Sequence, residues 1–394
     1  MKGASVTPAT TRGETANSRP LRILVVHNQP LARNGGMTRL MGFIHDEIVA
    51  HGHTVEYFGS ENLPRRWAGQ LARVSFPLAA FGHARKAALS GQPYDLINVH
   101  EPSSAAVVAG RRVLGNPAVV AMSYGVERRG WERAREEASL GRDRISVKTR
   151  IVYPATRLWQ SGLGLRHADH IFCSNFEDRD YLIRHYGRSA SEITRVFSGA
   201  STAYAAAPRD YRRARRLVFA GTWLLRKGTR DTIAAFATLH RRHPEVELHV
   251  LGSHVSADAV LADFPRELHP AIICDQRVTD AEAAAAFAAA DIYLLPSLFE
   301  GTPLTLIEAM MSGLPVVTTA TCGMKDVIRD GDNGLLVPMR SPEAIVQAVE
   351  RLLDDAALRE RLGRTAQRDA RANYTWDKVA APVRQVYERL CKPG

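Results

Sequence analysis

Two series of short apolar segments, each separated from the next by a helical pattern, most constrain how this chain can fold. Each segment is three to seven residues long and rich in Val, Ile and Leu, which is typical of buried strands. Alternation of strand and helix at this spacing predicts parallel sheets with right-handed crossovers. The first series comprises residues 21–26, 54–58, 95–101, 118–122, 170–173 and 194–197, and the second comprises 217–220, 247–251, 272–274, 292–295, 315–318 and 335–337.

Two series of strands predict an α/β chain of two Rossmann-like domains, each a doubly wound parallel sheet, facing a cleft. A chain of 394 residues is long enough for two such cores. Further helices are expected at about 36–49, 71–90, 103–114, 144–166 and 356–373, with residues 123–129 as a loop. The expected parts are a disordered tail (1–20), a first domain (21–200), a linker (201–216), a second domain (217–375) and a C-terminal helix (376–394).

Composition narrows the cellular setting. The chain is 45% hydrophobic and 24% charged, as ordinary globular proteins are, and it has no run of about 18 apolar residues. Its first twenty residues lack the apolar core of a signal peptide. The four cysteines form no paired motif, which favours free thiols in a reducing compartment; they are Cys173, Cys274, Cys322 and Cys391. We therefore expect a cytoplasmic protein.

The positive charge is concentrated in the first half of the chain. The net charge is +11, and residues 1–200 hold 27 Lys and Arg against 17 Asp and Glu. An anionic membrane surface, an acidic substrate, nucleic acid or a merely Arg-rich solvated surface would each account for this excess. We expect weak association with anionic membrane at the inner membrane face, with Arg65-Arg66-Trp67 as the candidate contact, and no nucleic-acid partner.

The segment from Phe299 to Met310 carries the strongest functional signal. It follows the buried strand 292–295, is broken by Gly301 and Pro303, and continues as a helical pattern. A strand, a Gly-containing turn and a helix start together present free backbone N–H groups and a positive dipole end to phosphate. Glu300 and Glu308 frame this site, at most about 12 Å apart. Carboxylates accept hydrogen bonds from sugar hydroxyls, so we expect them to bind the two ends of a nucleotide sugar.

This segment closely resembles the nucleotide-sugar site of the family-4 retaining glycosyltransferases, which have the GT-B fold. The resemblance rests on Glu300-x7-Glu308, on the surrounding Phe-Glu-Gly-Thr-Pro-Leu-x3-Glu-Ala-Met, and on Asp330-Gly331-Asp332-Asn333-Gly334. It implies transfer of a hexose from a nucleotide diphosphate sugar to a glycan or lipid-linked acceptor, in envelope or extracellular polysaccharide synthesis, without a metal or other cofactor. It also implies that the last helix packs back onto the first domain.

The resemblance assigns roles to individual residues. Glu300 would orient the sugar hydroxyls, and Glu308 would hold the ribose. Lys227 matches the lysine that neutralises the diphosphate, but the family arginine is replaced here by Thr222, and Arg226 is the candidate for compensation. Backbone groups of Gly301, Thr302, Pro303, Leu304, Thr305 and Leu306 would support the leaving group.

Other matches lie at expected strand ends. Gly35 and Gly36 follow the first strand and let the backbone approach a ligand closely. His100 ends the third strand, where the family has a histidine that reaches the donor hexose. Gly252, Arg277 and Val278 match positions near the base.

Metal motifs are absent or misplaced. Asp178-Arg179-Asp180 has the Asp-x-Asp pattern, but it opens a predicted helix on which residues two apart point away from each other. His51-Gly52-His53 lies where a helix is expected to end, which explains its glycine without a metal. Asp330-Gly331-Asp332 lacks the later glutamate of a calcium-binding loop and is interpreted as a turn. We predict no metal site.

Two alternatives remain open. A nucleotide-sugar 2-epimerase has the same two-domain architecture, and a degenerate relative would bind nucleotide sugar with weak or no turnover, for which Thr222 is the main argument. Gly-x-Ser-x-Gly, His-Glu-x-x-His and Gly-x-Gly-x-x-Gly do not occur, which argues against an esterase, a zinc protease or a dehydrogenase.

Overall fold

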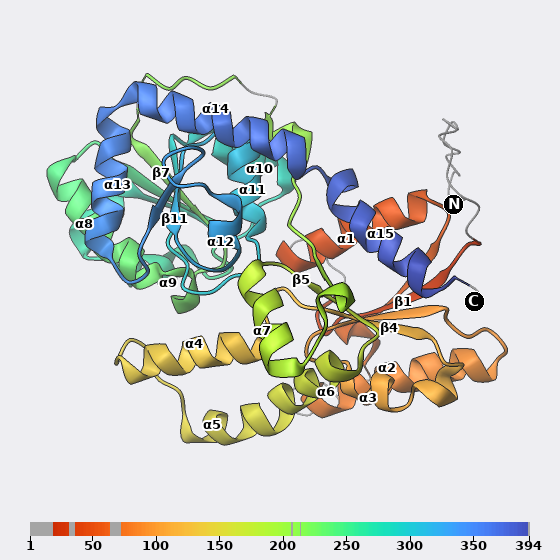
Figure 1. The fold of residues 1–394 in the computed structure, drawn as a ribbon. Helices are drawn as coiled ribbons and strands as arrows, with labels where there is room; N and C mark the ends of the chain where they lie inside the picture. The colour runs from red at the N-terminus through yellow and green to blue at the C-terminus, as the bar shows by residue number, and fades with distance from the viewer. Residues whose placement is uncertain (1–18, 31–35, 64–71, 206–207, 213, 393–394) are drawn as a thin grey trace, which may run out of the picture.

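The computed structural model describes residues 19–30, 36–63, 72–205, 208–212 and 214–392. The predicted tail, except for residues 19 and 20, lies outside these residues, as do Gly35 and the proposed membrane contact at 65–67. Figure 1 shows the chain folded into two α/β halves. We call each sheet, with the helices that cover it, the first and the second domain.

Each domain contains a six-stranded parallel sheet, as the sequence predicts. The order in the first sheet is β2 (Thr54–Phe58), β1 (Arg22–Val26), β3 (Leu96–His100), β4 (Ala118–Met122), β5 (His170–Cys173) and β6 (Ile193–Arg195). The order in the second is β12 (Leu335–Val337), β11 (Val316–Thr319), β10 (Ile292–Leu295), β7 (Arg216–Ala220), β8 (Glu247–Leu251) and β9 (Ile272–Asp275). Both orders reverse next to the first strand of the sheet, where the carboxyl ends of parallel strands form ligand sites.

Helices cover both faces of each sheet (Figure 1). In the first domain they are α1 (Gly36–Ala50), α2 (Ala72–Leu89), α3 (Ala105–Ala109), α4 (Glu127–Ser139), α5 (Val147–Tyr153), α6 (Trp159–His167) and α7 (Phe176–Tyr186). In the second they are α8 (Thr229–Arg242), α9 (Ala257–Leu261), α10 (Asp280–Ala289), α11 (Leu304–Met311), α12 (Cys322–Val327), α13 (Pro342–Asp354) and α14 (Ala356–Asn373). No helix within the described ranges is both long and apolar enough to cross a membrane.

The last helix, α15 (Trp376–Leu390), follows the second domain in sequence but packs on the first. Its buried residues Val383 and Tyr387 belong to the same apolar cluster as Met41 and Ile44 of α1. The Tyr387 hydroxyl also accepts a 2.5 Å hydrogen bond from Asn98 Nδ2 on β3. The core of the first domain is therefore completed by the end of the chain.

Two helical predictions need correction. The predicted loop 123–129 gives way to α4 at Glu127, a helix with Trp131 and Glu137 as its buried residues, so that hydrophobic periodicity hardly marks it. The helix expected at 103–114 is interrupted at Gly110, between α3 and a 3₁₀ turn. A Cβ at Gly110 would lie 2.2 Å from the Phe81 ring, so only glycine lets α2 and this segment approach so closely.

The expected long helix at 144–166 is present as α5 and α6 joined by a π-helical turn at Pro154–Leu158. Pro154 has no backbone N–H and cannot make the α-helical hydrogen bond at its position, so the regular α-helical pattern is interrupted there. The three segments follow one another without a gap and form one longer helix.

Candidate functional site

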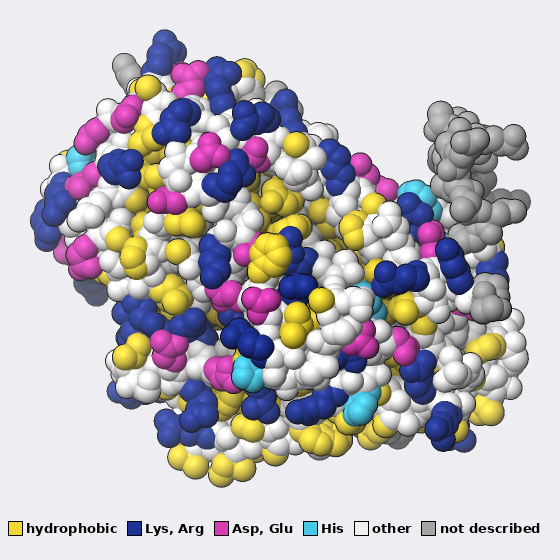
Figure 2. Space-filling view, in the orientation of Figure 1, with side chains coloured by type: hydrophobic (Ala, Val, Ile, Leu, Met, Phe, Trp, Pro, Cys, Tyr) yellow, Lys and Arg dark blue, Asp and Glu magenta, His cyan; other side chains and the backbone are white. Residues whose placement is uncertain are grey.

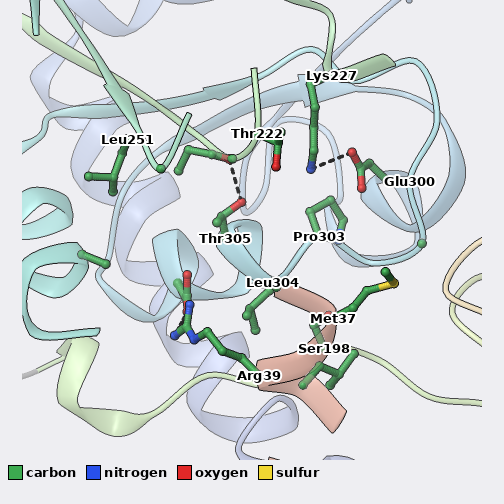
Figure 3. A pocket seen from close by; sticks show the side chains of 18 of the residues that line it. Met37, Arg39, Ser198, Thr222, Lys227, Leu251, Glu300, Pro303, Leu304 and Thr305 are labelled. Atoms are coloured by element: carbon green, nitrogen blue, oxygen red, sulfur yellow. Dashed lines mark hydrogen bonds and ion pairs between the residues drawn. The ribbon is translucent and has the colours of Figure 1, made fainter. Parts of the chain in front are cut away.

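A cavity of about 300 Å³ lies between the two domains (Figure 3). From the first domain it is lined by the start of α1 and by Tyr124 and Ser174, which follow β4 and β5. From the second it is lined by the loops after β7, β8 and β9 and by the start of α11. Both domains therefore present the carboxyl ends of their strands to one space, as ligand sites in open α/β sheets require.

The N-terminus of α11 faces this cavity. Pro303 is its N-cap residue and has no side chain that could satisfy the first backbone N–H groups. The turn before it is fixed by the first domain, because Thr302 Oγ1 donates to the Ser174 carbonyl at 2.7 Å and Ser198 Oγ donates to the Thr302 carbonyl at 2.6 Å. A Cβ at Gly301 would lie 2.5 Å from the Tyr124 carbonyl oxygen, so the turn needs glycine here. The result is an N-terminus positioned for an anion.

Glu300 lies at one end of the cavity beside two cations. Its Oε1 lies 2.7 Å from Lys227 Nζ and 3.1 Å from Arg226 Nη1. Ser297 Oγ also donates to Oε1, at 3.3 Å. Burial acts to raise the pKa of Glu300, but the charges of Lys227 and Arg226 outweigh it, so the pKa is lowered and the carboxylate is ionised at neutral pH.

Glu308, one helical turn into α11, is held from the other domain. Arg39 Nη2 on α1 lies 2.7 Å from Glu308 Oε1, 2.9 Å from Asp280 Oδ1 and 3.3 Å from the Tyr204 hydroxyl. Burial raises the pKa of Glu308 in spite of this cation. The two glutamates thus lie in one cavity, but only Glu300 has its cations from its own domain.

Most of the predicted donor-site residues line this cavity. They are Gly36, Thr222, Arg226, Lys227, Gly252, Arg277, Val278, Glu300, Gly301, Thr302, Pro303, Leu304, Thr305 and Glu308. Leu306 does not line it and is fully buried in the core of the second domain. Arg226 is half-exposed and donates to the Phe299 carbonyl as well as to Glu300.

His100 is not among the residues that line the cavity. Its ring is buried behind Tyr124, with ring centroids 5.3 Å apart, and lies edge-on to His27 at 4.8 Å. Burial lowers the pKa of His100 well below its ordinary value, so the ring is neutral. In this structure its contact with the cavity runs through Tyr124, and its catalytic role stays a prediction.

Arg39 is the main residue that sequence reasoning missed. It lies three residues after Gly36, in the first turn of α1, where its side chain reaches the same ligand edge. Its partner Glu308 is 269 residues away, so no local pattern signals the pair. Other lining residues lie in no recognisable motif; they include Met37, Leu40, Ser198, His254 and Phe287.

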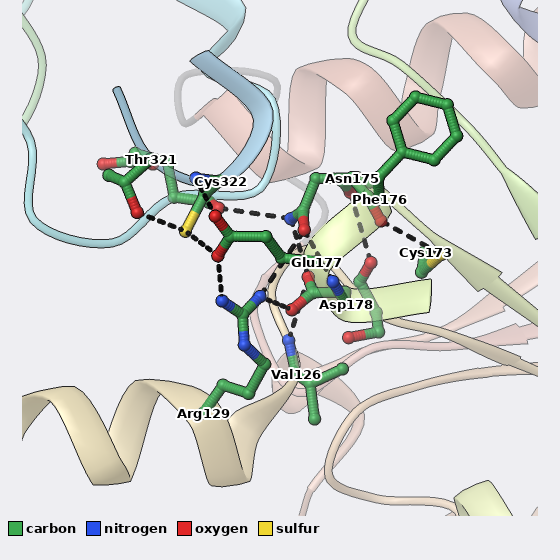
Figure 4. Close-up of polar contacts among 12 residues, drawn as sticks. Val126, Arg129, Cys173, Asn175, Phe176, Glu177, Asp178, Thr321 and Cys322 are labelled. Carbon is green, nitrogen blue, oxygen red and sulfur yellow. Dashed lines mark hydrogen bonds and ion pairs between the residues drawn. The ribbon is translucent and has the colours of Figure 1, made fainter. Parts of the chain in front are cut away.

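A second set of polar contacts joins the domains beside the cavity (Figure 4). Arg129 on α4 pairs with Asp178, at 2.5 Å, and with Glu177. Glu177 Oε1 also lies 2.7 Å from Lys325 Nζ of the second domain and accepts a hydrogen bond from the Cys322 N–H. Asp178, from the Asp-x-Asp pattern, is thus the partner of an arginine, and no cluster of metal-binding side chains occurs in the described ranges.

Parts of the sequence are similar to known glycosyltransferases. Residues 214–355 match the family described as glycosyl transferases group 1. Glycogen synthase of Mycobacterium tuberculosis is 28% identical over 228 residues, 57% of this chain and 55% of that protein. Phosphatidyl-myo-inositol mannosyltransferase of Mycolicibacterium smegmatis is 26% identical over 348 residues, 85% of this chain and 81% of that protein. The chain spans about half the length of the first curated relatives that it matches.

Solved structures agree on the fold. Sucrose-phosphate synthase of Thermosynechococcus elongatus superposes with a TM-score of 0.77 at 21% identity, covering 93% of this chain and 98% of that one. The HepE protein of Anabaena, solved in complex with UDP-glucose, gives a TM-score of 0.67 at 15% identity, over 93% and 99% of the two chains. The predicted GT-B fold is confirmed. Residues 214–355 are therefore similar to the glycosyl transferases group 1 family, and they lie in a chain with two Rossmann-like domains.

Proposed function

We propose that this protein is a retaining glycosyltransferase that transfers a hexose from a nucleotide diphosphate sugar to a glycan or lipid-linked acceptor. The observation that carries the proposal is the uncapped N-terminus of α11 between Glu300 and Glu308, facing a cleft between the two domains. The group 1 domain match and the UDP-glucose complex of the similar HepE protein support a nucleotide-sugar donor.

In the proposed reaction the bond between the anomeric carbon and the diphosphate oxygen breaks, and its electrons remain on the diphosphate. The acceptor hydroxyl oxygen bonds to the anomeric carbon on the same face, and its proton passes to the leaving diphosphate oxygen. Lys227 and the N-terminus of α11 stabilise the negative charge that develops on the leaving group. Glu300 orients the hexose hydroxyls and Glu308 binds the ribose.

The acceptor is proposed to bind the first domain. A smaller cavity of about 190 Å³ lies at the carboxyl ends of β1 and β3, lined in part by Asn28, Gln29, Ser103 and Arg157. Amide and hydroxyl groups of this kind suit sugar hydroxyls, and an arginine suits an anionic group on the acceptor.

An exposed stripe on α5 and α6 favours a membrane-linked acceptor. Val147, Ile151 and Trp159 are 72%, 65% and 62% exposed, and Val147 and Ile151, four residues apart, lie on one face of α5. Arg144, Lys148 and Arg150 are exposed nearby and form no ion pair within the described ranges. In Figure 2 hydrophobic side chains with Lys and Arg beside them gather along the lower edge of the molecule, over α5.

A basic helix with an exposed apolar face and a Trp fits the surface of an anionic bilayer. We therefore propose weak attachment to the cytoplasmic membrane face through this stripe. The test is sedimentation with phosphatidylglycerol-containing vesicles at low and high salt, comparing the triple variant Val147→Ser, Ile151→Ser, Trp159→Ser with Leu89→Ser, an exposed leucine on α2. Equal binding by both variants would remove this stripe from the proposal.

The activity itself is tested by release of nucleoside diphosphate. A thermal-shift screen of UDP-, GDP- and ADP-sugars identifies the donor, because a ligand that binds the folded state raises the melting temperature. Release that requires acceptor, with an α-linked product from an α-linked donor and no effect of EDTA, supports a retaining and metal-independent transferase. Release without acceptor points to the epimerase, and binding without release points to a degenerate relative.

A further inference from the structure

Among the described residues that line the cavity, one cation belongs to the first domain. Arg39 projects from α1 beside Leu304 and the first turn of α11 (Figure 3). Its guanidinium is mostly buried and pairs with Glu308, at 2.7 Å, and with Asp280, at 2.9 Å. Lys227 and Arg226 are both committed to Glu300, at the other end. Glu308, the proposed ribose ligand, is therefore occupied by a protein side chain before any nucleotide arrives.

We propose that Arg39 is a donor-binding cation that exchanges partners: it neutralises Glu308 in the free protein and turns to the diphosphate when the nucleotide binds. This inference rests on the proposed function. Ribose hydroxyls that bind Glu308 compete with Arg39 for the same carboxylate. The displaced guanidinium keeps Asp280, whose side chain is 57% exposed, and ion pairs with such exposed carboxylates contribute little. A mostly buried cation needs a stronger partner, and the diphosphate brings one into the same cavity.

The exchange of partners by Arg39 also explains how the site works with a threonine at position 222. The loop after β7 has a threonine where the family has an arginine, and Thr222 lines the cavity. A guanidinium binds two phosphate oxygens at once, which an ammonium group does not, so Arg39 is chemically equivalent to the missing side chain. Its origin differs, however. Because Arg39 comes from the first domain, binding of the diphosphate would join the two domains through the ligand.

The experiment separates the two partners of Arg39 by comparing nucleosides with nucleoside diphosphates. Uridine and UDP, guanosine and GDP, and adenosine and ADP are titrated by calorimetry into the wild type, Arg39→Ala and Arg39→Lys. The control variant is Arg230→Ala, which removes an exposed arginine close to the same loop that does not line the cavity. Melting temperatures verify that each variant folds.

For the pair that binds the wild type, Arg39→Ala should bind the nucleoside as tightly as the wild type or more tightly, because Glu308 no longer has a competitor. The same variant should bind the diphosphate roughly 10- to 100-fold more weakly, the range for a lost hydrogen bond to a charged group. Arg39→Lys should fall between the two, since it keeps the charge but not the paired donors. Arg230→Ala should bind both as the wild type does.

Two results would overturn the inference. Equal weakening of nucleoside and diphosphate by Arg39→Ala would mean that Arg39 only supports the shape of the site. An unchanged affinity for the diphosphate would mean that Arg39 never reaches it. Both are distinct from failure of the proposed function, in which none of the three diphosphates binds the wild type.

Discussion

The carboxyl ends of the two sheets face the same cleft but differ in charge. In the first domain burial shifts two ionisable groups at this edge toward their neutral forms, lowering the pKa of His27 to about 4 and raising that of Glu101 to about 7. In the second domain Glu300 remains ionised because Lys227 and Arg226 pair with it. We infer that the second edge is built for an anionic donor and the first for the hydroxyls of an acceptor.

The largest effect should follow removal of the cation that is buried at the charged edge. We expect Lys227→Met to lower turnover by about tenfold to a thousandfold, as loss of one electrostatic donor to a leaving group does. The measurement is steady-state release of nucleoside diphosphate. Lys325→Met is the matched control, because Lys325 pairs with Glu177 outside the cavity. Turnover that is unchanged by Lys227→Met would place the diphosphate elsewhere.

Substitutions of Glu300 and Glu308 should change different kinetic constants. Glu300→Gln should mainly lower kcat, because it removes contacts to the reacting sugar, whereas Glu308→Gln should mainly raise the KM for the donor, because ribose is bound equally before and during reaction. The expected size of each is roughly 10- to 100-fold, as for hydrogen bonds that involve a charged group. Equal losses of kcat with unchanged donor affinity would contradict the assignment of both ends.

At the neutral edge, Glu101 should make stability depend on pH. Burial raises the pKa of this carboxyl from 4.5 to about 7, so between these values the unfolded state loses a proton that the folded state keeps. Stability should therefore fall as pH rises from about 4.5 to 7. Glu101→Gln lacks this proton, and its stability relative to the wild type should increase over that window by at most about 3 kcal/mol.

The measurement for Glu101 is urea unfolding of both proteins at several pH values. The control is Glu132→Gln, which removes a carboxylate that accepts from the Tyr181 hydroxyl on the outer helices. A constant difference between Glu101→Gln and the wild type from pH 4.5 to 7 would show that Glu101 is ionised in the fold, and the comparison of a neutral with a charged edge would fail.

The smallest effects should come from substitutions of Arg226 and Thr222, both in the loop after β7. Arg226→Ala should cost less than about fivefold in turnover, because exposed ion pairs contribute about 0–1 kcal/mol. Thr222→Arg should change the wild-type rate little but restore part of the diphosphate affinity lost in Arg39→Ala. If the folded double variant binds the diphosphate no better than Arg39→Ala alone, an arginine at position 222 does not replace Arg39, and this prediction is wrong.

The sequence predicted the charged edge better than the neutral one. Each part of the segment 299–310 is local: a buried strand, a turn that needs glycine and an amphipathic helix start follow one another in the chain. The position of Arg39 depends on contact between elements of different domains, and that of His100 behind Tyr124 depends on side-chain packing, so neither follows from local pattern. The sequence did not predict helix α4 at 127–129, because this helix packs largely through ion pairs and not through apolar side chains; one of these pairs joins Arg340 and Glu137 at 2.6 Å.

Because α15 belongs to the first domain, the chain crosses between the domains twice, and the two crossings touch. Ala200 N–H donates to the Tyr374 carbonyl at 2.8 Å, and a Cβ at Gly199 would lie 2.7 Å from the Trp376 ring. We expect the relative motion of the two domains to be easiest about the line through these two adjacent links. A single cut in the backbone at either crossing would leave the two domains joined by the other.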